Sequence, residues 1–148
     1  MRATETNSGE ALLIVGAGVA GLSLATALGC AGINVTVIDG ASRPLTPADG
    51  RDINDWDLRV SALTPASVAF LNGLGAWSQI PESRKACYTG MKVWDAQGSG
   101  RIDFAASDVE ALSLGHIVEN RLTLQALLMC AESCPHVEVL WEHGLVAM

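Results

Sequence analysis

The feature that most constrains this chain is a run of closely spaced glycines between two short apolar segments. Residues 16–21, Gly-Ala-Gly-Val-Ala-Gly, have the spacing G-x-G-x-x-G. The apolar run 11–15 before them predicts a buried parallel strand, and the Leu- and Ala-rich stretch 19–31 predicts a helix. A second strand is expected to end at Asp39. We therefore expect a β-α-β unit over residues 11–39.

Each glycine of this motif has a separate physical role at a phosphate site. Gly16 permits the tight turn out of the strand, Gly18 lets a pyrophosphate approach the backbone, and Gly21 lets helix and strand pack closely. Val19 and Ala20 begin the helix, whose unpaired N–H groups and positive dipole end attract anions. In this strand–turn–helix context the motif predicts binding of the ADP half of a dinucleotide.

An acidic residue closes the second expected strand. Asp39 follows Gly21 at a distance that lets its carboxylate accept hydrogen bonds from ribose hydroxyls. The same carboxylate disfavours a ribose 2′-phosphate, so we expect FAD or NAD in this site rather than NADP. The alternative is a glycine-rich packing turn, with Asp39 as an ordinary acid at the end of a strand.

The chain after Asp39 departs from the repeated β-α pattern of an NAD-binding domain. A polar excursion spans 40–57, and Thr64-Pro65 predicts a capped helix that ends near Leu74. A β-hairpin is expected from the segments 90–96 and 101–105. After the second strand (33–38), the remaining expected elements are strands at 114–118 and 137–140, and a helix at 121–133 capped by Asn120. These departures favour FAD as the dinucleotide.

Composition indicates a globular protein and argues against two classes of partner. With 148 residues, 49% of them hydrophobic, the chain has the size of one domain and enough apolar material for a core. A net charge of −7 argues against nucleic acid and against capture by an anionic membrane surface. The stretch 11–38 is uncharged, but its glycines and strand-like alternation argue against a transmembrane segment. Residues 1–10 are expected to be a disordered tail.

Cysteines and histidines late in the sequence raise the question of a metal site. Cys130, Cys134, His136 and His143 could bind zinc, but their spacing matches no zinc template. We therefore expect no metal, and interpret the cysteines as reduced thiols. His116 lies in an apolar stretch without an acidic partner that the sequence can place, and is interpreted as structural. The sequence assigns no catalytic residue.

Two further runs are more specific than the glycines. Asp-Leu-Arg-Val-Ser-Ala-Leu-Thr-Pro-Ala-Ser occupies 57–67, and Leu-Gly-His-Ile-Val-Glu-Asn-Arg occupies 114–121. Together with the glycine motif, they resemble the FAD-dependent aromatic hydroxylases of ubiquinone biosynthesis, which belong to the para-hydroxybenzoate-hydroxylase-like flavoprotein monooxygenases. The resemblance is to the bacterial 2-polyprenylphenol hydroxylases in particular, and extends from about Leu12 to Leu140.

This resemblance implies an enzyme and assigns roles to individual residues. NAD(P)H would reduce the flavin, which would activate O₂ to hydroxylate a polyprenylated phenol. The residues implied at the cofactor are Gly16, Gly18, Val19, Ala20, Gly21, Asp39, Arg59 and Asn120. Arg59 would lie near the phosphates or the flavin, since a guanidinium can bond phosphate through two donors. The alternatives are a salt bridge of Arg59 with Asp55 or Asp57, and a plain helix cap for Asn120.

The resemblance also implies an incomplete domain, because family members are longer and carry later Asp-Gly and Gly-Asp motifs. Residues 11–148 are therefore expected to be the N-terminal part of a Rossmann-like α/β FAD-binding domain with an inserted β-hairpin, inactive alone. Further expectations are association with other ubiquinone-biosynthesis proteins and a cytoplasmic location, alternatively peripheral at the inner membrane. Two other functions stay open: an NAD-dependent Rossmann dehydrogenase and a non-catalytic nucleotide-binding fragment.

Overall fold

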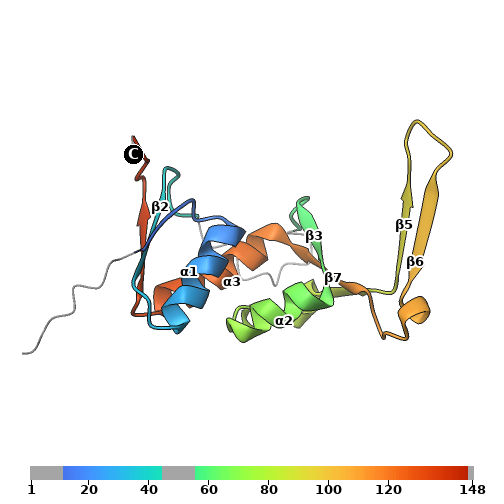
Figure 1. The fold of residues 1–148 in the computed structure, drawn as a ribbon, viewed down its shortest axis with the longest axis horizontal. Coiled ribbons are helices and arrows are strands. Elements are labelled where there is room, and N and C mark those ends of the chain that lie inside the picture. The colour runs from blue at the N-terminus through green and yellow to red at the C-terminus, as the bar shows by residue number, and fades with distance from the viewer. Residues whose placement is uncertain (1–11, 45–55, 147–148) are drawn as a thin grey trace, which may run out of the picture. The chain divides into compact units, whose positions relative to one another are not determined.

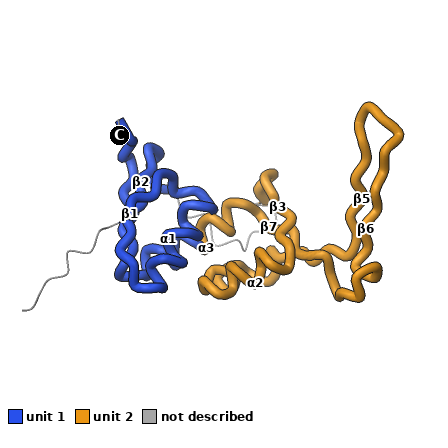
Figure 2. Tube along the Cα trace, in the orientation of Figure 1, with its two compact units in different colours: residues 1–45, 127–148 blue, residues 46–126 orange. Residues whose placement is uncertain are grey.

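The computed structural model describes residues 12–44 and 56–146, which divide into two compact units (Figure 1, Figure 2). The first unit comprises residues 1–45 and 127–148, and the second comprises residues 46–126. The tail expected at the N-terminus and most of the expected polar excursion lie outside the described residues.

A parallel sheet with a connecting helix forms the basis of the first unit. Its strands are β1 (Leu12–Val15), β2 (Val35–Asp39) and β8 (Val137–Trp141), in the order β1-β2-β8. Helix α1 (Val19–Cys30) connects β1 to β2, and helix α3 (Asn120–Ser133) precedes β8. All neighbouring strands are parallel, which confirms the expected Rossmann-like β-α-β unit.

The central strand β2 is buried, whereas β1 is not. Val35 and Val37 of β2 are at most 2% exposed, and this strand has a neighbour on each side. Leu12, Leu13 and Val15 of β1 are between 46% and 59% exposed. The expectation of a buried first strand is therefore wrong in part. Strand β1 is parallel as expected, but it forms an edge of the described sheet and has one neighbouring strand.

Close packing, rather than helix termination, explains the glycine near the end of α1. Gly29 lies inside the last turn of the helix, before the C-cap residue Ala31. A Cβ on Gly29 would stand 2.5 Å from Val137 Cγ2 and 2.7 Å from Cys134 Sγ.

The uncharged stretch 11–38 is divided among short elements, and no helix in the described part of the chain is long and apolar enough to cross a membrane.

The second unit contains an antiparallel sheet that the sequence did not predict. Its strands are β3 (Val60–Leu63), β7 (Gly115–Glu119) and β4 (Ala86–Tyr88), in the order β3-β7-β4. Only β7 was expected, and it is shifted by one residue. The other two strands have four and three residues, too few to show a clear alternation of apolar and polar positions.

Helix α2 (Pro65–Gly73) lies in the second unit and begins as predicted. The Thr64 side-chain oxygen accepts a hydrogen bond from the Ser67 N–H at 3.2 Å, and proline occupies the first turn. The described part of this unit also contains three short 3-10 helices: η1 (Trp77–Gln79), η2 (Glu82–Arg84) and η3 (Ala106–Val109).

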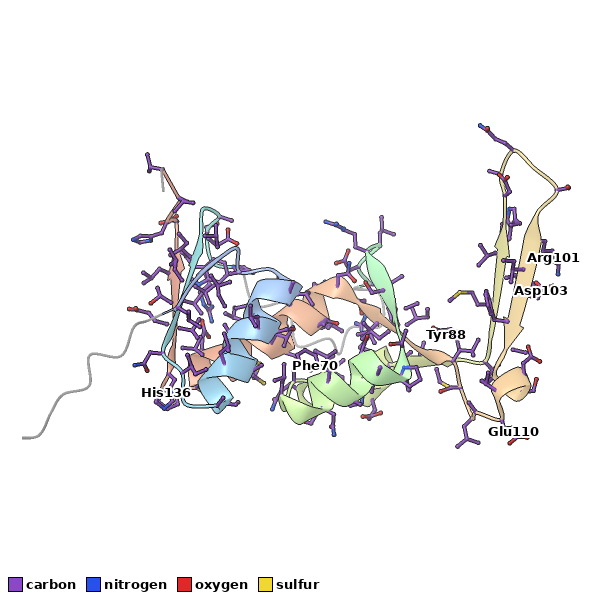
Figure 3. All side chains as sticks on the ribbon, viewed as in Figure 1. Phe70, Tyr88, Arg101, Asp103, Glu110 and His136 are labelled. Carbon is purple, nitrogen blue, oxygen red and sulfur yellow. The ribbon has the colours of Figure 1, made fainter. Side chains whose placement is uncertain are left out.

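The expected hairpin is present as β5 (Gly90–Trp94) and β6 (Arg101–Ala105), which pair antiparallel (Figure 1). One face carries the salt bridge between Arg101 and Asp103, with nitrogen and oxygen 2.9 Å apart (Figure 3). The opposite face is apolar and exposed, and consists of Met91, Val93, Ile102 and Phe104. The hairpin is therefore an amphipathic ribbon.

Candidate cofactor-binding site

The glycine loop between β1 and α1 leaves open space where a phosphate would approach. Gly16 adopts φ +103°, a left-handed conformation that favours glycine, and its N–H donates to the Ile38 carbonyl at 2.7 Å. Gly18 is the N-cap of α1, and a Cβ on it would meet no atom within 4 Å. A Cβ at Gly18 would therefore disturb no protein contact, but it would occupy the open space next to the loop.

Gly21 meets a different environment. A Cβ on Gly21 would overlap the Gly16 carbonyl oxygen and lie 3.4 Å from Ile14 Cγ2. Because the overlap is with backbone, the backbone would have to move. Glycine is therefore required at this position for the loop and the helix to pack, whether or not a ligand binds.

The N-terminus of α1 offers backbone donors. The first helical hydrogen bond runs from the Leu22 N–H to the Gly18 carbonyl. The N–H groups of Val19, Ala20 and Gly21 therefore precede the helical bonding pattern, and the N-cap has no side chain to accept from them. Together with the positive end of the helix dipole, these groups suit the oxygens of a phosphate.

Asp39 joins the end of β2 to the glycine loop. Its Oδ1 accepts a hydrogen bond from the Ala41 N–H, and its Oδ2 accepts one from the Ala17 N–H, both at 2.8 Å. The hydrogen bonds from Ala41 and Ala17 lower the pKa of the Asp39 carboxyl from its ordinary value, against a small opposing effect of burial. Each carboxylate oxygen has a second lone pair. Asp39 can therefore hold the loop and still accept from a ribose hydroxyl.

The second unit brings Arg59 and Asn120 together. The Asn120 N–H donates to the Arg59 carbonyl at 2.9 Å. The expectation that the Asn120 side chain caps α3 is wrong, because its Oδ1 instead accepts the hydroxyl hydrogen of Ser61 at 2.6 Å. Asn120 thus connects the start of α3 to β3 and to the residue before it.

Arg59 is exposed and has no ionic partner among the described residues. The alternative salt bridge with Asp57 does not form, because Asp57 Oδ1 accepts the backbone N–H of Arg59 at 3.1 Å instead. Asp55, the other alternative partner, lies outside the described residues. The Arg59 guanidinium is thus not engaged by the described carboxylates, as a phosphate-binding role would need.

A buried carboxylate immediately before Asn120 received no role in the sequence analysis. Glu119 is 1% exposed; its Oε1 accepts from Arg84 at 2.8 Å and its Oε2 from Arg121 at 2.9 Å. The same Oε2 accepts the backbone N–H of Asp57 at 2.7 Å. The sequence feature that could have indicated this role is a glutamate at the end of an apolar strand. A carboxylate at such a position becomes buried, and a buried carboxylate requires ionic or hydrogen-bonding partners.

His116 borders a cavity of about 410 Å³ beside α2 and β7. Its Nδ1 is buried without a hydrogen-bond partner, and its ring meets the Trp77 ring edge-on, with centroids 5.2 Å apart. No carboxylate in the described part of the chain bonds to the imidazole. A histidine packed in this way lacks the orienting acid of an acid–base pair, which supports its structural interpretation.

The zinc alternative finds no support in the described residues. No group of three or more histidines, cysteines or acids in ranges 12–44 and 56–146 is placed to hold a metal ion. His136 Nδ1 is 2.9 Å from Asn34 Oδ1 (His136 is labelled in Figure 3), and His143 Nδ1 is 2.6 Å from the Trp141 carbonyl oxygen.

Two relatives of this chain are a hydroxylase and a monooxygenase by name. The chain is 34% identical to 3-demethoxyubiquinol 3-hydroxylase of Escherichia coli over 143 residues, which cover 97% of this chain and 35% of the relative. It is 35% identical over 136 residues to ubiquinone biosynthesis monooxygenase COQ6, mitochondrial, of Xenopus tropicalis, covering 88% of this chain and 28% of the relative. The chain therefore spans roughly a third of the length of these relatives.

Solved structures share the fold. The tetrameric 2-methyl-3-hydroxypyridine-5-carboxylic acid oxygenase superposes with a TM-score of 0.68 at 18% identity, over 95% of this chain and 33% of that chain. The p-nitrophenol 4-monooxygenase of Pseudomonas putida superposes with a TM-score of 0.63 at 21% identity, over 93% of this chain and 34% of that chain. Residues 10–148 match the FAD binding domain family, and because this match covers nearly the whole sequence, the chain belongs to that family.

Proposed function

We propose that this chain is the FAD-binding portion of a monooxygenase that uses NAD(P)H and O₂ to hydroxylate a polyprenylated phenol in ubiquinone biosynthesis. The family supports FAD over NAD, and the names of the relatives support the reaction class. The observation that carries the proposal is the glycine loop. It is open above Gly18, leads into an uncapped helix and is tied to Asp39.

The residues of the first unit suit the ADP half of FAD. In our proposal, the backbone of Gly16, Gly18, Val19, Ala20 and Gly21 binds the pyrophosphate. The N–H groups at the start of α1 supply donors, and the absent side chain of Gly18 supplies room. Asp39 accepts from the adenosine ribose through the lone pairs that its two backbone hydrogen bonds leave free.

The residues of the second unit suit a polar contact with the rest of the cofactor. Arg59 presents an exposed guanidinium, which can donate two parallel hydrogen bonds to a phosphate. Asn120 uses its side-chain oxygen for Ser61, so its amide N–H groups are the part that would face a ligand. A bound flavin would supply electron transfer and oxygen activation, while these residues bind and orient it.

The prenyl tail of the proposed substrate affects the expected cellular location of the whole enzyme. Each buried methylene of such a tail favours a membrane over water by about 0.8 kcal/mol. We therefore propose a cytoplasmic protein that meets its substrate at the surface of the inner membrane, together with other ubiquinone-biosynthesis proteins.

Two parallel titrations test which cofactor the chain binds. The purified chain is titrated with FAD, followed by quenching of flavin fluorescence, and with NAD, followed by calorimetry. We expect binding of FAD with weaker or no binding of NAD. A preference for NAD would contradict the proposal and favour a dehydrogenase.

A chimera tests the reaction. Residues 10–148 replace the matching segment of the Escherichia coli hydroxylase, and the chimera is expressed in cells that lack that enzyme. We expect a yellow, FAD-containing chimera that restores ubiquinone synthesis, measured by mass spectrometry of lipid extracts. A chimera that holds FAD but accumulates the unhydroxylated precursor would contradict the proposed substrate class.

A further inference from the structure

Glu119 is held rigidly in the interior of the second unit. Its side chain is 1% exposed, and that of Arg84, which pairs with it at 2.8 Å, is 2% exposed. Arg121 pairs with the other carboxylate oxygen at 2.9 Å and has a side chain that is 24% exposed. Arg84 also lies over the Trp56 ring, 4.2 Å from its centroid. A carboxylate fixed between two guanidiniums has little freedom to move.

This fixed carboxylate holds the segment that carries Arg59. Glu119 Oε2 accepts the Asp57 backbone N–H at 2.7 Å, and the Asp57 side chain in turn accepts the Arg59 backbone N–H at 3.1 Å. On the other side, the backbone N–H of Asn120 donates to the Arg59 carbonyl. The backbone N–H and the backbone carbonyl of Arg59 are thus both hydrogen-bonded. The N–H bonds to Asp57, whose own backbone is held by Glu119, and the carbonyl bonds to Asn120, which follows Glu119 in the chain.

We propose that Glu119 is a positioning residue for the cofactor, which fixes the backbone of residues 57–59 so that the Arg59 guanidinium is presented to FAD. This inference rests on the proposed function. The Glu119 carboxylate has its buried oxygens engaged by Arg84, Arg121 and Asp57, so it acts through Arg59 without touching the ligand. Because the backbone of residues 57–59 is already fixed, FAD binding does not have to order this segment, which lowers the entropic cost of the contact with Arg59.

A double-mutant cycle tests this role. FAD affinity is measured by fluorescence titration for the wild type, Glu119→Gln, Arg59→Ala and the double variant. We expect Glu119→Gln to weaken FAD binding about fivefold to tenfold, and to change it less than about twofold in the Arg59→Ala background. An equal loss in both backgrounds would mean that Glu119 does not act through Arg59, and would overturn the inference.

A second variant is needed because Glu119→Gln removes one charge of the buried Arg84–Glu119 ion pair and could therefore disturb folding. The variant Arg84→Met with Glu119→Leu removes both charges while keeping apolar packing. We expect it to fold, by far-UV circular dichroism, and still to bind FAD about fivefold to tenfold more weakly. Wild-type affinity in this variant would show that the ion pair is purely structural and overturn the inference.

A matched control separates positioning from general loss of stability. Val118→Ala removes a buried side chain from the same strand, next to Glu119, without touching the segment 57–59. We expect it to lower the melting temperature and leave FAD affinity within about twofold of wild type. If it weakens FAD binding as much as Glu119→Gln, the inference is overturned. Absence of FAD binding by the wild type would instead contradict the proposed function itself.

Discussion

The glycines at positions 18 and 21 face different neighbours, so their substitution should have different effects. Gly18→Val places a branched side chain in open space, and should abolish FAD binding at a stability cost of about 1 kcal/mol, the loss of a favourable N-cap residue. Gly21→Ala should instead destabilise the fold by about 1–3 kcal/mol, because its Cβ meets the Gly16 carbonyl. Flavin titration and thermal unfolding of both variants check this. Equal FAD affinities of wild type and Gly18→Val would show that the loop is not the pyrophosphate site.

The Asp39 carboxylate should determine which nucleotide the first unit prefers. A free ribose 2′-hydroxyl can donate to it, whereas a 2′-phosphate would bring a second negative charge against it. We expect ADP to bind more tightly than 2′-phospho-ADP in isothermal calorimetry, and the preference to shrink in Asp39→Asn. Tighter binding of the phosphorylated ligand by the wild type would place the ribose elsewhere.

At the scale of elements, Asp39 links the end of β2 to the loop before α1, and this link should depend on pH. The folded-state pKa of Asp39 lies below its ordinary value of 3.8, so the ionised carboxylate stabilises the fold above that pH. The contribution is lost as the pH falls below 3.8 through the folded-state value. We expect the wild type to exceed Asp39→Asn in free energy of unfolding at neutral pH, and the difference to shrink below about pH 4. A difference that does not change with pH in urea titrations would contradict this.

The cap of α2 should contribute stability without affecting the cofactor. Thr64→Ala removes the oxygen that accepts the Ser67 N–H, and should cost about 0.5–2 kcal/mol of unfolding free energy. Thr64→Ser keeps the hydroxyl and serves as the control, with stability near that of the wild type. Chemical denaturation measures both variants. Equal destabilisation by serine and alanine would assign the effect to the lost methyl group instead of the cap.

At the scale of the whole molecule, exposed apolar surface should cause self-association. The edge strand β1 and the face of the hairpin formed by Met91, Val93, Ile102 and Phe104 are both exposed, and surfaces of this kind promote association. Phe104→Lys should lower the average mass in sedimentation experiments at a fixed concentration. Asp103→Asn, on the opposite face of the same strand, is the control and should not. A monomeric wild type at all concentrations would contradict the prediction.

Local patterns in the sequence were enough to predict several elements and one half of the candidate site. The G-x-G-x-x-G spacing, the apolar runs beside it and the acid at Asp39 determine a β-α-β unit, because turn chemistry and hydrophobic periodicity act over a few residues. The same holds for the Thr64 cap and for the hairpin. These features depend on neighbours in the chain, which the sequence shows directly.

Only the tertiary structure decided which distant groups meet. Asp39 bonds Ala17, twenty-two residues earlier, and Glu119 bonds Arg84 and Asp57, thirty-five and sixty-two residues away. Likewise, the short strands β3 and β4 both pair with β7, and β1 is an exposed edge strand of the described sheet. Strand pairing and buried ion pairs depend on where the folded chain brings its segments, and no local periodicity encodes that placement.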